Sequence, residues 1–262
     1  MTQPIVSVQD LKVHFPIRSG ILGRVTDHVR AVDGVSFDLM PGRTVAIVGE
    51  SGSGKSTTGY AVMGMQDPTE GRILIDGKDR AAVSGPERME TMRRLQIVFQ
   101  DPASALNPRM SAGDSIAEPL QIHRIGTARD RRAKVAELLD LVGLPQSSAG
   151  RLPREFSGGQ KQRIVIARAL ALDPQAVICD EAVSALDVSI QSQILNLLLE
   201  LQARLGLAYI FISHDLSVVR HIADDILVMH AGKVVEKGRT DDIFHAPRHR
   251  YTRQLLAAVP RL

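Results

Sequence analysis

The chain has little sulfur and few aromatic side chains. Its 262 residues include one cysteine and no tryptophan, and Phe, Tyr and Trp together make up 3%. A single cysteine excludes an intrachain disulfide and a cysteine cage for a metal, and it is compatible with a reducing cytosol. Cys179 lies in an apolar run with no base beside it, so we interpret it as core packing and not as a thiol nucleophile.

Long hydrophobic runs and a strong charge imbalance are also missing. No stretch reaches the roughly 18 apolar residues that a membrane-spanning helix needs, and the N-terminus lacks the basic-then-apolar layout of a signal peptide. The 32 Lys and Arg residues are nearly balanced by 29 Asp and Glu residues, and the net charge of +3 is too small to indicate nucleic acid. We expect a cytosolic protein whose contact with a membrane is peripheral or passes through a partner.

The order of apolar runs along the chain predicts an α/β fold. Continuous runs typical of strands buried on both faces are TVAIVG (44–49), LQIVFQDP (95–102), AVICDEA (176–182) and AYIFISHD (208–215). Strands that alternate with helical stretches indicate a parallel sheet covered on both faces. Residues 103–155 have helical spacing and predict an insertion into one α/β domain.

The two ends of the chain contain weaker strand signals. Residues 5–15 and 31–39 alternate in polarity, which predicts two half-buried strands. The polar, glycine-containing stretch 16–30 between them predicts a loop or insertion. Residues 72–78 predict a strand with a turn, and residues 224–238 predict a hairpin-like pair.

A phosphate-binding loop follows the first continuous apolar run. GESGSGKST (49–57) fits G-x-x-x-x-G-K-[ST], in which glycines let successive backbone N–H groups face phosphate oxygens. Lys55 would reach the β- and γ-phosphates, and the Ser56 hydroxyl can hold Mg²⁺. The alternatives are a Gly/Ser loop with a surface lysine and a dinucleotide-binding loop. The second fails because Thr57 occupies the sixth position counted from Gly52. The predicted nucleotide-binding residues here are Gly49, Glu50, Ser51, Gly52, Ser53, Gly54, Lys55, Ser56 and Thr57.

Polar side chains end three further apolar runs. Asp180 and Glu181 follow one of them, where ligands of parallel sheets bind, so Asp180 would act near Mg²⁺ and Glu181 could polarise a water. Without the phosphate loop, an ordinary acid pair capping a helix would be the better interpretation. Gln100 and His214 end two other runs, and their spacing alone assigns them no role.

A serine and two glycines precede a stretch of helical composition. FSGGQKQRIVIARAL (156–170) predicts a helix over Gln160–Leu170, with a flexible glycine corner in front of it. A serine and bare amides at a helix start suit an anion. The stretch itself does not say which anion it binds.

Six motifs in this order resemble those of the ATP-binding cassette (ABC) ATPases. They are the loop 49–57, Gln100, SGGQ (157–160), VICDE (177–181), SALD (184–187) and His214. The resemblance covers nearly the whole chain. It implies an α/β P-loop NTPase fold of the ABC nucleotide-binding type, with an N-terminal antiparallel β region. It also implies an ABC ATPase domain over 1–237, with a helical subdomain of about 103–156 inserted, and a short C-terminal extension over 238–262.

The resemblance assigns roles to the motif residues. ATP and Mg²⁺ are the implied cofactors, with Ser56, Gln100 and Asp180 at the metal. Glu181, His214 and Gln100 are the implied catalytic residues. The signature residues Ser157, Gly158, Gly159 and Gln160 would face the γ-phosphate of ATP held by a second ATPase subunit in a head-to-tail dimer. Phe15 would stack on adenine, although a core phenylalanine on the first strand is a serious rival interpretation. Ala182 departs from the proline common after the catalytic glutamate, which affects local rigidity more than chemistry.

Several stretches are similar to one importer group in particular. VFQDPASALNPRM, DEAVSALDVSIQ and HAPRHRYTRQLLAAVP resemble the ATPase subunits of bacterial dipeptide, oligopeptide and nickel importers. The implied partners are a second ABC ATPase subunit, two transmembrane permease subunits and an extracytoplasmic solute-binding protein, with no nucleic acid. The implied location is the cytoplasmic face of the inner membrane. No cluster or metal is expected in the tail, which has no cysteine. The alternatives are an accessory ATPase of a phosphonate-degrading complex and an importer for nickel or another small solute.

Overall fold

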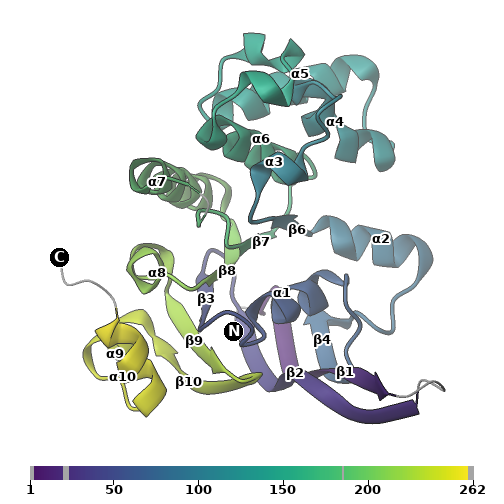
Figure 1. Ribbon diagram of the computed structural model, residues 1–262. Helices are drawn as coiled ribbons and strands as arrows, with labels where there is room; N and C mark the ends of the chain where they lie inside the picture. The colour runs from purple at the N-terminus through teal and green to yellow at the C-terminus, as the bar shows by residue number, and fades with distance from the viewer. Residues whose placement is uncertain (1–2, 20–23, 185, 259–262) are drawn as a thin grey trace. The chain divides into compact units, whose positions relative to one another are not determined.

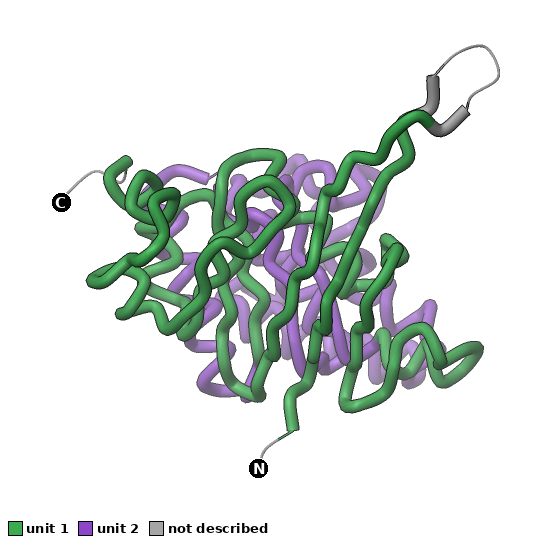
Figure 2. The backbone as a smooth tube through the Cα atoms, turned by 90° about the horizontal axis from the view of Figure 1, so that it is seen from below, with its two compact units in different colours: residues 1–92, 208–262 green, residues 93–207 purple. Residues whose placement is uncertain are grey.

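The computed structural model describes residues 3–19, 24–184 and 186–258, and the chain divides into two compact units (Figure 2). Unit 1 combines Met1–Met92 with Ala208–Leu262, so segments from both ends of the sequence fold together. Unit 2 is the continuous stretch Arg93–Leu207. Of the predicted extension 238–262, residues 259–262 lie outside the described part, as does Ala185 of the SALD motif.

An antiparallel sheet forms the N-terminal part of unit 1, as the resemblance implied. Its strand order is β2-β1-β4-β5, with bounds Arg24–Leu39, Val6–Ser19, Glu70–Ile75 and Lys78–Asp79. For the described residues 16–19 and 24–30, the prediction of a loop or insertion is wrong, because Pro16 pairs with His28 and Ile17 pairs with Asp27. These strands project from unit 1 as a long ribbon (Figure 2). Residues 26–30 are exposed, so their polarity reflects solvent around a two-stranded ribbon and not the absence of a strand.

A second sheet of unit 1 carries the predicted buried strands. β3 (Thr44–Val48) pairs in parallel with β8 (Ala208–Ser213) and with β9 (Asp225–His230). β9 pairs antiparallel with β10 (Lys233–Arg239), which confirms the hairpin near the C-terminus. Every residue of β3 and β8 is buried, as continuous apolar runs predict.

Helices cover this sheet, and two more helices follow its last strand. α1 packs against β1, β2 and β8, and α8 packs against β3 and β8 (Figure 1). Two short helices follow β10 in the C-terminal segment. The bounds of these four helices are α1 Lys55–Met63, α8 Leu216–Ile222, α9 Thr240–His245 and α10 Arg250–Ala257. α2 (Gly85–Arg93) spans the boundary between the two units in the sequence.

Unit 2 is a parallel strand pair joined by a helical stretch. β6 (Leu95–Val98) pairs with β7 (Ala176–Asp180), and the helical spacing of 103–155 is confirmed by the helices between them. α4, α5 and α6 lie together above α3 (Figure 1). The bounds are α3 Pro102–Ala105, α4 Ala112–Ile122, α5 Ala128–Leu141, the 3-10 turns η1 Gln146–Gly150 and η2 Pro153–Glu155, α6 Gly158–Leu170 and α7 Val188–Leu205.

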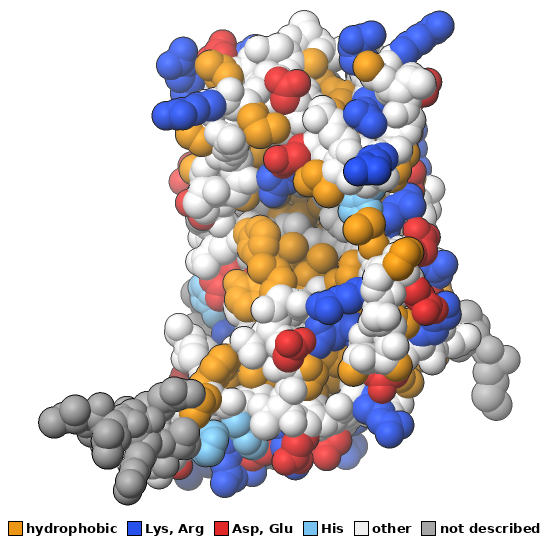
Figure 3. Space-filling view, turned by 90° about the vertical axis from the view of Figure 1, so that its right-hand side faces the viewer, with side chains coloured by type: hydrophobic (Ala, Val, Ile, Leu, Met, Phe, Trp, Pro, Cys, Tyr) orange, Lys and Arg blue, Asp and Glu red, His pale blue; other side chains and the backbone are white. Residues whose placement is uncertain are grey.

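The surface carries both signs of charge. On the face drawn in Figure 3, Lys and Arg side chains stand among Asp and Glu side chains and do not form one continuous basic surface. Within the described residues, none of the helices combines the length and the hydrophobicity needed to span a bilayer.

Candidate nucleotide-binding site

The phosphate loop joins β3 to α1, and its backbone depends on glycine. Gly49, Gly52 and Gly54 have φ angles of 152°, 77° and 101°, a region that L-residues rarely occupy. A β carbon on Gly49 would lie 2.2 Å from the Met229 carbonyl oxygen, and one on Gly54 would lie 2.1 Å from the Ala31 carbonyl oxygen. The glycines therefore serve both the turn and the close packing of the loop.

The interior of the loop holds groups suited to a phosphate. Lys55 is 4% exposed, and its Nζ donates hydrogen bonds of 2.8 Å to the carbonyls of Gly49 and Glu50. The buried Ser53 hydroxyl has no hydrogen-bond partner among the described residues. A buried ammonium, an orphaned hydroxyl and the N-terminal end of α1 together fit the charge and acceptor oxygens of a nucleotide phosphate.

The C-terminal part of unit 1 supports the loop from outside. The Gly232 amide, in the turn between β9 and β10, donates to the Ser53 carbonyl at 3.1 Å. The Glu50 amide donates to the Tyr251 hydroxyl at 3.1 Å. Sequence reasoning missed both contacts, because each residue lies far along the chain from the loop and no motif pairs it with the loop.

His214 leaves the sheet beside the phosphate loop. Val48 pairs with Ser213 in the parallel β3–β8 ladder, so Gly49 and His214 follow neighbouring strands at the same edge of the sheet. The His214 side chain is exposed. This placement is compatible with the predicted contact to the γ-phosphate, which stays a prediction.

Phe15 lies on β1 opposite Val29 and is 40% exposed. That exposure argues against the rival interpretation as a core residue. An exposed aromatic ring is available to stack on a base. Stacking of Phe15 on adenine stays a prediction.

The carboxylate pair sits at the end of β7 in unit 2. Asp180 is its last residue and is 4% exposed, and Glu181 follows with a left-handed φ of 47°. A non-glycine residue in this region costs about 1–2 kcal/mol and persists where its surroundings hold it. The Ser184 amide and Oγ both donate to the Glu181 carbonyl at 3.0 Å. These two hydrogen bonds hold the turn, in which Ala182 takes the position where the family commonly has proline.

Gln100 reaches the same turn. Its Nε2 donates to Ser184 Oγ at 3.4 Å, so the structure brings Gln100 and the Glu181 turn together within unit 2. Cys179, one residue before Asp180, is fully buried, and burial raises the pKa of its thiol to about 12. This supports its interpretation as inert core packing.

The signature glycines belong to the helix, and the predicted start at Gln160 is wrong by two residues. α6 begins at Gly158, with Ser157 as its N-cap. Ser157 Oγ accepts from the Gln160 amide at 3.3 Å, and Gln160 Oε1 accepts from the Ser157 amide at 3.0 Å. This reciprocal capping box stabilises a helix start, so two glycines are tolerated there. Ser157 and Gly158 are exposed and Gly159 is buried.

Comparison with protein-family models shows which family the chain belongs to. The ABC transporter model matches residues 32–184, which is more than half of the chain. The chain belongs to the ABC transporter family. The model of the oligopeptide/dipeptide transporter C-terminal region matches residues 235–262 of this ABC protein.

Curated relatives of this ABC chain include glutathione import ATP-binding proteins named GsiA. The protein of Escherichia coli is 53% identical over 259 residues, and that of Pectobacterium atrosepticum is 52% identical over 258 residues. Each match covers 98% of this chain and 41% of the relative, so the chain spans less than half the length of these relatives.

Solved structures confirm the ABC ATPase fold. CbiO1 of Clostridium perfringens, described as part of the ABC transporter complex cbiONQ, is 29% identical with a TM-score of 0.80, over 93% of this chain and 91% of that chain. The ATP-binding cassette MJ0796, solved as a dimer in a post-hydrolysis state with ADP and Pi, is 28% identical with a TM-score of 0.77, over 90% and 98%.

Proposed function

We propose that this chain binds and hydrolyses ATP as the energy-supplying subunit of a bacterial ABC importer for dipeptides or oligopeptides. The observation that carries the proposal is the phosphate loop, with the buried Lys55 ammonium and the orphaned Ser53 hydroxyl inside it. The match of residues 235–262 to an oligopeptide/dipeptide transporter region supports the solute class. Because the similar GsiA proteins import glutathione, that tripeptide is the first solute to test.

The loop and three oxygen-bearing side chains would hold the nucleotide and its metal. Lys55 and the loop amides take the phosphates, and Ser56, Gln100 and Asp180 hold Mg²⁺, directly or through water. When bound, Mg²⁺ neutralises charge on the phosphate oxygens as the terminal bond breaks. Asp180 is 4% exposed, and carboxyl oxygens are among the ligands that Mg²⁺ takes in proteins.

Glu181 would orient and polarise the attacking water. Its left-handed backbone, fixed by Ser184, aims its side chain away from the direction that a regular strand would give. His214 would donate a hydrogen bond to the γ-phosphate from the edge of β8. Phe15 would stack on the adenine.

Turnover would require two cassettes. Ser157, Gly158, Gly159 and Gln160 would face ATP bound to a second ATPase subunit, since the capped N-terminus of α6 presents amides and partial positive charge. The dimer reported for the structurally similar MJ0796 supports this arrangement.

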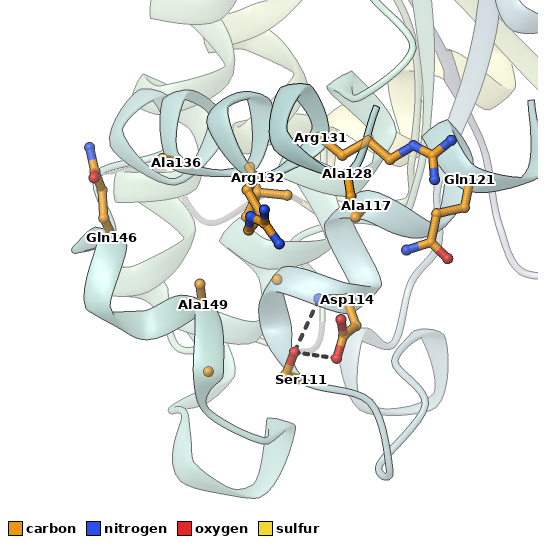
Figure 4. Close-up of a pocket in the computed structure, with 13 residues that line it drawn as sticks. Ser111, Asp114, Ala117, Gln121, Ala128, Arg131, Arg132, Ala136, Gln146 and Ala149 are labelled. Atoms are coloured by element: carbon orange, nitrogen blue, oxygen red, sulfur yellow. Dashed lines mark hydrogen bonds between the residues drawn. The ribbon is translucent and has the colours of Figure 1, made fainter. Parts of the chain in front are cut away.

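A groove in unit 2 would receive the permease. It lies between α4, α5 and η1, with a volume of about 570 Å³ (Figure 4). α4 contributes Asp114 and Ala117 to its lining, and α5 contributes Arg131, Arg132 and Ala136. A short cytoplasmic helix with acidic residues fits such a groove. The chain would then sit on the cytoplasmic face of the membrane, with a solute-binding protein outside.

The first test is ATP hydrolysis by the purified chain and by its Lys55→Ala variant. Loss of turnover in the variant, with an exposed Lys78→Ala control unaffected, is expected. Equal rates in Lys55→Ala and the wild type would refute the phosphate-loop assignment. Copurification then tests the partners. Membrane permeases are expected, and soluble lyase subunits in their place would indicate the phosphonate-degrading alternative.

A further inference from the structure

The phosphate loop donates one hydrogen bond to the C-terminal helix. Glu50 is the first residue after Gly49, where the β3 ladder has already ended, so its amide lacks a partner strand. The Tyr251 hydroxyl accepts that hydrogen bond at 3.1 Å, across 201 residues of sequence. A buried or half-buried amide without a partner is costly, so the phenol oxygen completes the backbone of the loop.

The tyrosine ring is itself held firmly. Tyr251 is 7% exposed, and its ring centroid lies 4.1 Å from that of His230, with the two planes at 38°. Burial raises the pKa of Tyr251, so its hydroxyl stays protonated at physiological pH. A neutral phenol is therefore a fixed acceptor for the Glu50 amide.

The helix that carries Tyr251 is anchored at its first turn. Glu236 on β10 accepts hydrogen bonds from the amides of Arg248 at 2.7 Å and His249 at 3.0 Å. Burial alone would raise the pKa of this carboxyl, but the Thr252 side chain and these two amides face it and lower its pKa. The position of Tyr251 is thus fixed by charge-assisted contacts from the sheet.

A second contact acts on the same loop from the same part of the chain. Gly232 donates to the Ser53 carbonyl, so the loop is held at Glu50 and at Ser53, on either side of the exposed Ser51 and Gly52. Amides that bind phosphate must point inward before the ligand arrives, and fixing the loop at two points reduces the entropy lost on binding.

We propose that Tyr251 is a positioning residue that sets nucleotide affinity by holding the phosphate loop in its binding geometry, so that the C-terminal helix forms a working part of the nucleotide site. The proposal rests on the proposed ATPase function, because it assumes that the loop binds a nucleotide. Tyr251 contacts the loop through the Glu50 amide, so we expect it to act on nucleotide affinity and not on the hydrolysis step.

The test is binding of a fluorescent ADP analogue, with Mg²⁺, to the Tyr251→Phe variant. This substitution keeps the ring against His230 and removes only the acceptor. We expect the Kd to rise about threefold to tenfold, the effect of one hydrogen bond. The kcat at saturating ATP should change less than twofold. Tyr209→Phe is the matched control, because it also removes a phenol hydroxyl from a buried tyrosine. Tyr209 pairs with Thr44, at the opposite end of β3 from the loop, so this variant should leave the Kd within twofold.

A spectroscopic measurement distinguishes positioning from general stability. The chain has three tyrosines, so 3-fluorotyrosine labelling gives three ¹⁹F resonances that single Tyr→Phe variants assign. Because the hydrogen bond to Glu50 is present before the ligand binds, the Tyr251 resonance should be a single sharp line without ADP. An unchanged Kd in Tyr251→Phe, an equal loss in Tyr209→Phe, or a Tyr251 resonance that is broad or split without ADP each overturns the proposal. Failure of the wild type to bind ADP or ATP would instead overturn the proposed function.

Discussion

Gly159 and Ile190 are packed so closely that a β carbon on the glycine would lie 2.6 Å from Cγ2 of the isoleucine. The neighbouring Gly158 has room, since its β carbon would lie 3.6 Å from Leu186 Cδ2. Two adjacent glycines of one motif therefore face different constraints. Gly159 is required by packing inside the chain, and Gly158 is exposed and free of that requirement.

Alanine at each position should separate stability from activity. Gly159→Ala forces Ile190 to move, and overpacking of this kind costs about 1–3 kcal/mol. A fall in Tm of several degrees is expected by differential scanning calorimetry. Gly158→Ala should leave the Tm unchanged but reduce ATP hydrolysis, because its side chain would enter the surface that faces the partner's nucleotide. Equal Tm values for the two variants would contradict the packing argument.

Glu181→Gln should retain ATP binding and lose turnover. The amide preserves the shape of the side chain but cannot accept a proton from water, and loss of a general base lowers a rate by about 10²–10⁴-fold. Single-turnover hydrolysis and gel filtration with ATP measure the rate and the accumulation of a closed dimer. Glu200→Gln, an exposed carboxylate of α7, is the matched control and should behave as the wild type. Normal turnover in Glu181→Gln would reject the assignment.

Phe15→Ala should weaken ATP binding without affecting the fold. Stacking of one base on an aromatic ring contributes about 1–3 kcal/mol, which corresponds to roughly 5- to 150-fold in Kd. Ile17 lies two residues along the same strand and is 42% exposed, so Ile17→Ala removes a comparable apolar group from the same face. Titration with ATP should distinguish the two variants. Similar affinities would show that adenine binds elsewhere.

Cys179 should be inert toward thiol reagents in the native chain. It is fully buried, and with a pKa of about 12 the reactive thiolate is scarce at neutral and moderately alkaline pH. A chromogenic disulfide reagent should detect no thiol at pH 8 and one thiol per chain in denaturant. A thiol that reacts at full rate without denaturant would mean that β7 opens readily.

Local chemistry made much of this molecule predictable. Short-range requirements determine the apolar runs of β3, β7 and β8 and the glycine-lysine pattern of the loop. The sequence alone therefore predicts these features. The pairing of residues 16–19 with residues 24–28 was not predicted, because an exposed ribbon carries the same polar residues as a loop. The left-handed Glu181 was not predicted either, since its conformation comes from hydrogen bonds to Ser184.

Contacts between distant segments escaped prediction for a different reason. The alternation of polar and apolar residues shows which face of a segment is buried, but not which segment covers it. Gly159 could be matched to a motif, yet only the fold shows that Ile190 lies against it. The sequence places Tyr251 in a stretch that resembles the importer family. Its hydrogen bond to Glu50 depends on the placement of α10, which the sequence does not show.

The two contacts that support the phosphate loop, from Gly232 and Tyr251, can form only late in synthesis. The loop leaves the ribosome well before Gly232 and Tyr251, because Tyr251 lies 201 residues after Glu50. Until they emerge, a nascent cassette has the lysine and glycines but lacks the two contacts that hold them in place. Translation products that stop before Gly232 should therefore bind nucleotide weakly.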